Sequence, residues 1–268
     1  MKRLEGRDAT ALVAVITIVD EEHAAVKAIG GFNDHVGDTP YMFRNRTADR
    51  EYDVILAKSA DRSNTPCAEL VFDLAERFRP EYIILSGIAG GIERDGVELG
   101  DVIVADHVEG YEIMKFEKGR SMIRRMAIDH PSKYLRETIA ARVSRSEHWK
   151  KRIAASRPTK GEPKVIVGNL IAGDKILGDG DNEYQQKILH EYDKAIAVDM
   201  ESQGLARGVY TARGARFYNL NYLVVRGISD LVNGQENNED RKKWREYAAA
   251  VAAAFSISAV DELVELRR

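Results

Sequence analysis

Carboxylate side chains follow directly after several apolar segments of the chain that are typical of buried strands. Glu22 follows the first of these segments, Glu201 follows a later one, and Asp230 comes just past the last. Taken singly, each acid also fits a helix cap or a solvated surface. In an open α/β sheet, however, strand ends meet at one crevice, so acids that are distant in sequence can share a site. Acids that meet there could protonate a leaving group and stabilise a developing positive charge.

A glycine-rich segment adjoins one of these predicted strands. The apolar run Tyr82–Leu85 is typical of a buried strand, and Gly87, Gly90 and Gly91 follow it. A second predicted strand, Val102–Ala105, comes soon afterwards. Glycine has no Cβ and lets a ligand approach the main chain closely. We therefore expect the first strand to end in a small-residue loop beside the acids, although glycine spacing by itself favours a purely structural turn.

Predicted strands and helices alternate along the chain. Mostly continuous apolar strands between amphipathic helices favour an α/β fold with a central mixed, mostly parallel twisted sheet flanked by helices. No repeat or low-complexity linker divides the sequence, so we expect a single domain over residues 1–268. The stretch from about 117 to 160 is rich in lysine and arginine, and its helical part at 134–155 is the least core-like part of the chain. We interpret this stretch as a basic helical insertion over one face.

The composition limits the kinds of partner. The chain has 268 residues, of which 44% are hydrophobic, and its 40 basic and 43 acidic residues leave a net charge of −3. This balance gives no electrostatic reason to expect nucleic-acid or membrane binding. The first residues lack the apolar segment of a secretory signal, and the apolar run Tyr247–Val260 is shorter than the roughly 20 residues of a membrane span. We therefore expect a cytoplasmic protein in which this run is a buried helix.

Cysteine and histidine are too sparse to suggest a metal or redox centre. Cys67 is the one cysteine, so no intrachain disulfide can form, and a reducing compartment fits. The six histidines are scattered, without the spacing of metal ligands. We expect neither a metal nor a cofactor.

Six short motifs occur in the order found in a known family. They are IVDEE at 18–22, GIAGG at 87–91, LGDVIV at 99–104, AGDKIL at 172–177, AVDMES at 197–202 and VRGISD at 225–230. With these motifs the sequence resembles the nucleoside phosphorylase and nucleosidase superfamily, and within it the methylthioadenosine/S-adenosylhomocysteine nucleosidases in particular. The resemblance runs from about residue 11 to the C-terminal end, apart from a stretch near 116–160. It is specific for the superfamily and much less so for the substrate.

The resemblance implies an activity and roles for four residues of the last two motifs. The activity is that of a purine nucleoside or nucleotide N-glycosidase, which hydrolyses the N-ribosidic bond and releases a free base, for which we expect adenine. Asp230 would give a proton to purine N7, and Ser229 would orient its carboxyl group. Glu201 would hold the ribose hydroxyls, with Met200 packed beneath the sugar. Asp230 must then carry a proton near neutral pH, which requires burial or neighbouring acids.

The other motifs supply the rest of the implied site. Glu22 would act as the base that aligns the attacking water. Asp199 stands where the family has a glutamate, and we count it with the substrate-binding residues. The remaining positions would meet the purine through main chain or apolar packing; they are Ala89, Gly90, Lys175, Ile176 and Leu177.

Departures from the family pattern bear on the second substrate. Related phosphorylases bind phosphate with an arginine and a serine at the positions that Leu85 and Ile88 occupy here. Water is therefore the expected co-substrate, although Arg44, Arg46 or Arg226 could supply positive charge from elsewhere. Two alternatives stay open: a phosphate-dependent nucleoside phosphorylase and a catalytically silent nucleoside-binding module.

A basic cluster precedes the predicted insertion. Its members are Lys115, Lys118, Arg120, Arg124 and Arg125. Such a cluster is usually a solvated face, and the alternative is that it binds phosphates at the 5′ end of a nucleotide.

The family resemblance also implies a homo-oligomer. Tyr111 and Phe116, two aromatic residues that we expect to be exposed, give this prediction modest support. The expected partners are a small-molecule nucleoside or nucleotide and further copies of the chain.

Overall fold

The computed structural model describes residues 10–46, 51–216, 218–232, 234 and 237–267. Its strands are β1 (Thr10–Thr17), β2 (Asp34–His35), β3 (Met42–Arg46), β4 (Glu51–Lys58), β5 (Tyr82–Gly91), β6 (Val102–Gly110), β7 (Met114–Glu117), β8 (Arg120–Ile123), β9 (Met126–Ala127), β10 (Val165–Ala172), β11 (Ala195–Asp199) and β12 (Asn221–Leu231). Its helices are α1 (Asp20–Gly30), α2 (Asn64–Arg77), the π-helix η1 (Leu135–Ala140), α3 (Ala141–Ser146), the 3₁₀-helix η2 (His148–Arg152), α4 (Glu183–Glu191), α5 (Ser202–Arg216) and α6 (Asn237–Arg267).

One large mixed sheet organises the fold. Within the described residues its strand order is β11-β10-β6-β12-β5-β1-β4-β3-β2, with β9 paired to β6. The pairs β1–β4, β1–β5, β5–β12, β6–β10 and β10–β11 are parallel. The β12–β6 and β3–β4 pairs are antiparallel. The structure thus has the predicted α/β architecture with a mixed, mostly parallel sheet.

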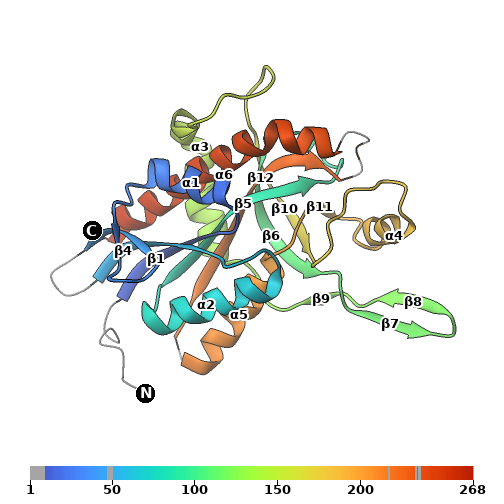
Figure 1. Ribbon diagram of the computed structural model, residues 1–268, viewed down its shortest axis with the longest axis horizontal. Coiled ribbons are helices and arrows are strands. Elements are labelled where there is room, and N and C mark those ends of the chain that lie inside the picture. Colours follow the sequence, from blue (N-terminus) through green and yellow to red (C-terminus); the bar gives the residue numbers. More distant parts are fainter. Residues whose placement is uncertain (1–9, 47–50, 217, 233, 235–236, 268) are drawn as a thin grey trace.

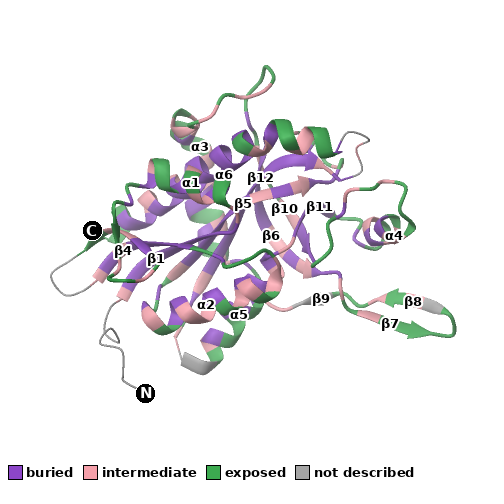
Figure 2. Ribbon diagram, viewed as in Figure 1, coloured by how far each residue is buried: buried purple, intermediate pink, exposed green. Residues whose placement is uncertain are grey.

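Helices cover both faces of the sheet (Figure 1). Side chains alternate along β1, so Ala14 and Ile16 enter the core under α2 and α5, whereas Val13 and Val15 enter the core under α1 and α6. Figure 2 shows the central strands and the inner sides of these helices buried, with exposed residues on their outer sides. A strand buried on both faces explains why the apolar runs of the sequence are continuous.

The glycine-rich segment is a strand, which corrects the prediction of a loop. β5 continues through Gly91 because β12 pairs with it along Asn221–Leu231. β12 likewise extends past Arg226, so Asp230 lies on the strand itself. The glycines serve close packing here: a Cβ on Gly91 would lie 2.9 Å from Ile228 Cγ2. Adding a side chain would thus force neighbouring atoms apart.

The sheet curves so that its edge strand β11 also contacts the central strand β5. β11 pairs with β10 at the edge and also forms an antiparallel contact with β5, through Val198 opposite Gly90. This closure brings the end of β11 against the ends of β5 and β12. The residues that follow these strands therefore face one another, although they are far apart in sequence.

Residues 117–160 contribute more to the core than the sequence predicts. The segment begins in a projecting β7–β8 hairpin and continues as three short helices (Figure 1). Leu135, Ile139 and Trp149 are buried in the core beside α6, and the Trp149 ring lies 5.4 Å from the Phe255 ring. Apolar residues that lie between the polar ones of this stretch form a buried face. Its helical part is therefore not the least core-like part of the chain.

The helix α6 is the central helix on its face of the sheet. By length and composition alone it could cross a membrane, but 83% of its most apolar 18-residue window is buried inside the fold. Its run Tyr247–Val260 packs on β12 and β5, in agreement with the buried helix that the sequence predicts.

We expect Trp149→Ala to lower the free energy of unfolding by about 3–5 kcal/mol, because it removes a fully buried ring and leaves a cavity. The matched control is Tyr210→Ala on α5, where the side chain is 61% exposed; we expect a change within about 0.5 kcal/mol. Urea denaturation of both variants measures these values. Equal stability of the two variants would mean that the 117–160 segment packs only loosely on the core.

Candidate functional site

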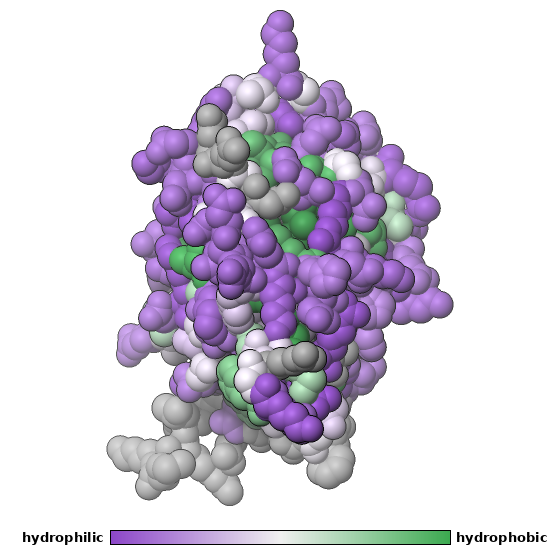
Figure 3. Space-filling view, turned by 90° about the vertical axis from the view of Figure 1, so that its right-hand side faces the viewer, coloured by the Kyte–Doolittle hydropathy of each residue, from purple (hydrophilic) through white to green (hydrophobic). Residues whose placement is uncertain are grey.

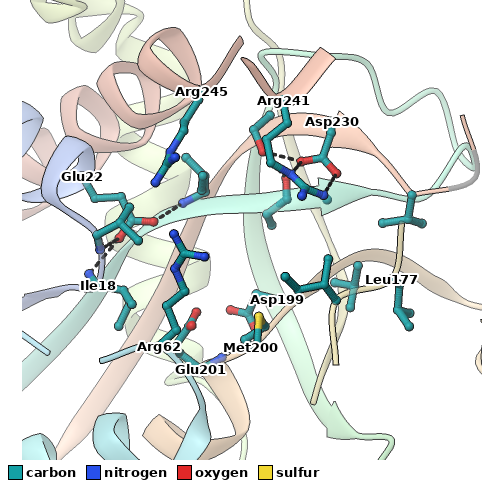
Figure 4. Close-up of a pocket in the computed structure, with 18 of the residues that line it drawn as sticks. Ile18, Glu22, Arg62, Leu177, Asp199, Met200, Glu201, Asp230, Arg241 and Arg245 are labelled. Carbon is teal, nitrogen blue, oxygen red and sulfur yellow. Dashed lines mark hydrogen bonds and ion pairs between the residues drawn. The ribbon is translucent and has the colours of Figure 1, made fainter. Parts of the chain in front are cut away.

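A cavity of about 340 Å³ opens where β1, β5, β11 and β12 end. Its size suits a small-molecule ligand. Every site residue expected from the sequence lines it: Glu22, Ala89, Gly90, Lys175, Ile176, Leu177, Asp199, Met200, Glu201, Ser229 and Asp230. Further lining residues are Ile18, Val19, Arg62, Ile88, Val198, Val232, Arg241 and Arg245. Figure 4 shows Glu22 and Glu201 toward one end, and Asp230 with Leu177 toward the other.

Glu22 is held in the first turn of α1 by main-chain donors. The N–H groups of Ile18 and Val19 donate to its Oε2 at 2.8 and 3.1 Å. The N–H of Ile88 on β5 donates to Oε1 at 2.8 Å. The side chain is only 3% exposed. Three donors from two strand ends fix the carboxylate at the cavity wall, which suits a group that must orient a small reactant.

Arg226 on β12 joins the acids of three elements. Its Nε donates to Asp199 at 2.8 Å, and its Nη2 pairs with Asp199 at 2.5 Å and with Glu201 at 3.1 Å. Its Nη1 lies 4.0 Å from Glu22 Oε1 and has no hydrogen-bond partner within the described part of the chain. Burial alone would lower the pKa of this guanidinium, but the charges of Asp199, Glu201 and Glu22 outweigh it and raise the pKa.

The gap between Arg226 Nη1 and Glu22 exists because residue 87 is glycine. A Cβ on Gly87 would overlap both Nη1 and Glu22 Oε1. An unpaired buried N–H beside a carboxylate oxygen is a costly arrangement unless a polar ligand occupies it. A small polar ligand bound at Nη1 would supply the missing hydrogen-bond partner.

Glu201 directly precedes α5 and is 6% exposed. Burial raises the pKa of its carboxyl to about 7; Arg226 opposes this rise, while Asp199 and Glu22 add to it. Its Oε1 accepts a hydrogen bond from the N–H of Ser63 at 3.2 Å. The carboxyl group therefore changes its charge near neutral pH.

Asp199 lines the cavity, but other protein groups occupy its oxygens. Oδ1 accepts the N–H groups of Glu201 and Ser202, and Oδ2 accepts the Ser202 hydroxyl and Arg226. Its side chain is 1% exposed. In this arrangement Asp199 caps α5 and anchors Arg226, whereas the sequence suggested a direct contact with the ligand.

Asp230 is surrounded by donors. Asn237 donates to its Oδ1 at 2.7 Å, and the Ser229 hydroxyl donates to its Oδ2 at 2.6 Å. Arg241 on α6 binds both oxygens, at 3.0 and 3.1 Å (Figure 4). A bidentate guanidinium stabilises an ionised carboxylate. The sequence predicts burial or neighbouring acids around Asp230; the side chain is buried, and its charged neighbour is an arginine rather than an acid.

The segment after β10 borders the Asp230 end of the cavity. Ile176 is 58% exposed, whereas Leu177 is buried. The Lys175 carbonyl accepts the Tyr111 hydroxyl at 2.5 Å, so that oxygen is already engaged. Tyr111 itself is fully buried, which corrects the prediction that it is exposed.

The sequence analysis did not predict three arginines of the cavity wall. Arg241 and Arg245 are four residues apart and so lie on one side of α6, and Arg62 lies in the turn between β4 and α2. The position of Arg62 after a parallel strand is a signal that could have found it. Of the cations suggested instead, Arg44 pairs with Asp261 outside the cavity, and Arg226 is engaged by acids.

The predicted basic cluster lies elsewhere. Lys115, Lys118, Arg124 and Arg125 do not line the cavity, and the side chain of Arg120 lies outside the described residues. Arg46 is likewise absent from the cavity wall.

Figure 3 views the side of the molecule that carries the hairpin and shows apolar surface in a hollow among polar side chains. In the described part of the chain no group of three or more His, Cys, Asp or Glu residues is arranged to hold a metal ion.

Comparisons with known proteins agree with the family expected from the motifs. A family model described as "Phosphorylase superfamily" matches residues 30–261. A "Death domain-containing ATP nucleosidase" from Amphimedon queenslandica is 23% identical over 224 residues, which cover 79% of this chain and 40% of that protein. A "5'-methylthioadenosine/S-adenosylhomocysteine nucleosidase" from Staphylococcus aureus is 28% identical over 166 residues, which cover 60% of this chain and 62% of that protein. The chain thus spans less than two thirds of either relative.

A solved structure shows the same fold. The structure of a putative 5'-methylthioadenosine/S-adenosylhomocysteine nucleosidase from Borrelia burgdorferi, bound to adenine, superposes with a TM-score of 0.70 at 18% identity. The match covers 94% of this chain and 100% of the other. The predicted fold class is confirmed.

We expect Gly87→Ala to lower the free energy of unfolding by about 1–3 kcal/mol, because the new methyl group must push Glu22 and Arg226 apart. Gly214→Ala on α5 is the matched control, since a Cβ there meets nothing within 4 Å and alanine favours a helix. Urea denaturation measures both variants. A Gly87→Ala protein as stable as the control would show that the two charged groups are not closely held.

Proposed function

Because the chain belongs to the phosphorylase superfamily, we propose that it is a purine N-ribosyl hydrolase, which cleaves the N-ribosidic bond of a nucleoside or nucleotide and releases the free base. The observation that carries the proposal is the cavity itself. Glu22, Glu201 and Asp230 come from three distant parts of the sequence and line one space of ligand size. Cleavage of this bond needs chemistry at two ends of one ligand, and the cavity has two distinct ends.

The sugar belongs at the Glu22 end. As the bond breaks, positive charge develops on the ribose, and nearby carboxylates stabilise it. Glu201 accepts hydrogen bonds from the ribose hydroxyls, and Met200 packs against the ring. The attacking water sits in the gap between Glu22 Oε1 and Arg226 Nη1, where the buried N–H otherwise lacks a partner. Its oxygen bonds to C1′, and Glu22 accepts its proton.

The base belongs at the Asp230 end. The electron pair of the C1′–N9 bond passes to the purine, and a proton from Asp230 to N7 neutralises the leaving base. Ser229 orients the carboxyl group through its hydrogen bond of 2.6 Å. Because the Arg241 guanidinium occupies both oxygens of Asp230, the purine must displace it before Asp230 can donate a proton to N7. Ala89, Gly90, Lys175, Ile176 and Leu177 line the surface against which the base packs.

Water is the proposed nucleophile and adenine the proposed base. Support for water comes from Leu85 and Ile88, which stand where related phosphorylases bind phosphate. Support for adenine comes from the names of the relatives, an ATP nucleosidase and a methylthioadenosine/S-adenosylhomocysteine nucleosidase. The first of these names also supports a nucleotide as substrate.

We also propose that the enzyme acts in the cytoplasm as a homo-oligomer. Its single cysteine, Cys67, is buried and unpaired, which suits a reducing compartment. The exposed Phe116 on the projecting hairpin is a candidate contact between copies.

We expect Asp230→Asn to lower kcat by about 10²–10⁴-fold, because an amide cannot deliver the proton that the leaving purine needs. Asp34→Asn on β2 is the matched control, since Asp34 is exposed and distant from the cavity wall. Chromatography of free adenine released from adenosine and ATP measures the rates, and circular dichroism checks the fold. Undiminished release by Asp230→Asn would remove Asp230 from the mechanism.

We expect kcat/KM to rise with pH through about 7, because Glu201 must be ionised to accept the ribose hydroxyls and burial raises its pKa to about 7. The ionised fraction grows as the pH exceeds the pKa, so the acidic side of the profile is the inactive side. Glu201→Gln should lose this limb together with most of the activity. An unchanged limb in Glu201→Gln would assign the titration to another group.

A further inference from the structure

Two arginines face the cavity at its sugar end, and the chemistry proposed above uses neither. Arg62 lies in the turn between β4 and α2, and Arg245 lies on α6. Figure 4 shows their side chains extending toward one another on the side of Glu22 and Glu201, away from Asp230. Both arginines therefore flank the part of the cavity that lies beyond the proposed ribose position, on the side away from the base.

The other cations of the cavity are neutralised by acids. Arg226 pairs with Asp199 and Glu201 of the cavity wall, Arg241 binds Asp230, and Lys175 pairs with Glu112. Among the described residues the guanidinium of Arg62 has no hydrogen bond or ion pair, and the residue is exposed at the cavity mouth. Its charge is thus available to a ligand.

Arg245 is only partly engaged. One of its nitrogens, Nη2, pairs with Glu21 at 3.0 Å. Its Nε is buried and has no hydrogen-bond partner within the described part of the chain. A buried guanidinium nitrogen without a partner is costly, so a bound anion would satisfy a donor that the protein leaves open.

The turn that carries Arg62 is fixed beside the proposed ribose site. The Ser63 N–H donates to Glu201 at 3.2 Å, and the Ser63 hydroxyl donates to Asp174 at 2.8 Å. The Asn64 N–H also donates to Asp174, at 3.1 Å. Arg62 is therefore one residue from a direct contact with the carboxylate that would hold the sugar. An anion bound by Arg62 would lie next to the ribose.

We propose that Arg62 and Arg245 form an anion subsite for the 5′-phosphate groups of a purine nucleotide, so that the substrate of this chain is a nucleotide rather than a free nucleoside. The assignment rests on the proposed hydrolase function, which places ribose at Glu201. The 5′ carbon is attached on the side of the sugar away from the base, and its phosphates extend to the cavity mouth. Paired guanidinium groups are the side chains best suited to phosphate oxygens.

A free phosphate ion shares this chemistry. It would occupy the same arginines if the enzyme were a phosphorylase. Nucleotides in phosphate-free buffer, and adenosine with added inorganic phosphate, distinguish the two sources of the anion.

The test measures adenine release from adenosine, AMP and ATP by the wild-type protein. Two charge-assisted contacts predict a kcat/KM that is about 10–100-fold higher for AMP or ATP than for adenosine. Arg62→Gln and Arg245→Gln should each reduce the rate for ATP by about tenfold more than the rate for adenosine. Arg207→Gln, an exposed arginine on α5 outside the cavity, removes the same charge and should change none of the rates.

Three outcomes would overturn the subsite: equal rates for adenosine and ATP, equal losses for all substrates in Arg62→Gln, or adenosine cleavage that requires added phosphate and yields ribose 1-phosphate. Absence of adenine release from every substrate would instead refute the hydrolase function. In that case calorimetry of adenosine and ATP binding to the wild type and Arg62→Gln decides the subsite. Tighter ATP binding that depends on Arg62 supports it, and equal binding of both ligands overturns it.

Discussion

The ion cluster around Arg226 is the interaction on which the rest of the site depends. The guanidinium is fully buried and contacts Asp199 and Glu201, with Glu22 at 4.0 Å. Removing one partner from such a cluster leaves buried charge without compensation and is strongly destabilising. The cluster therefore ties α1, β11 and the start of α5 to β12. It also leaves one nitrogen, Nη1, without a hydrogen-bond partner among the described residues, which is where the proposed water would be held.

The sheet makes this cluster possible. The parallel strands β1, β5 and β12 deliver Glu22, Gly87 and Arg226 to neighbouring positions, and the return contact of β11 on β5 adds Asp199 and Glu201. Gly87 permits the approach because any larger side chain would fill the gap. The glycine-rich motif thus reflects close packing, against charged groups at Gly87 and against apolar side chains at Gly91, and the segment remains a strand throughout.

The charges of the cavity differ between its two ends. At one end, burial raises the pKa of Glu201 to about 7. Arg62 and Arg245 face the cavity mouth there, with N–H donors that have no partner among the described residues. At the other end, Arg241 and Asn237 surround Asp230. Arg241 binds both oxygens of Asp230, whereas the proposed chemistry needs one of them to face N7 of the purine. Entry of the purine must therefore rearrange Arg241, whereas Glu22 and Arg226 are already in place.

The sequence by itself determined the family, the α/β class and the acids of the site, because these depend on short motifs and on runs of apolar residues whose pattern is local. It did not reveal that Trp149 belongs to the core, that Arg241 pairs with Asp230, or that Arg62 and Arg245 face one another. Only the tertiary structure decided these points. Each depends on how the elements pack, because Trp149 meets the distant Phe255, and Arg62 and Arg245 line one cavity although they come from opposite ends of the chain.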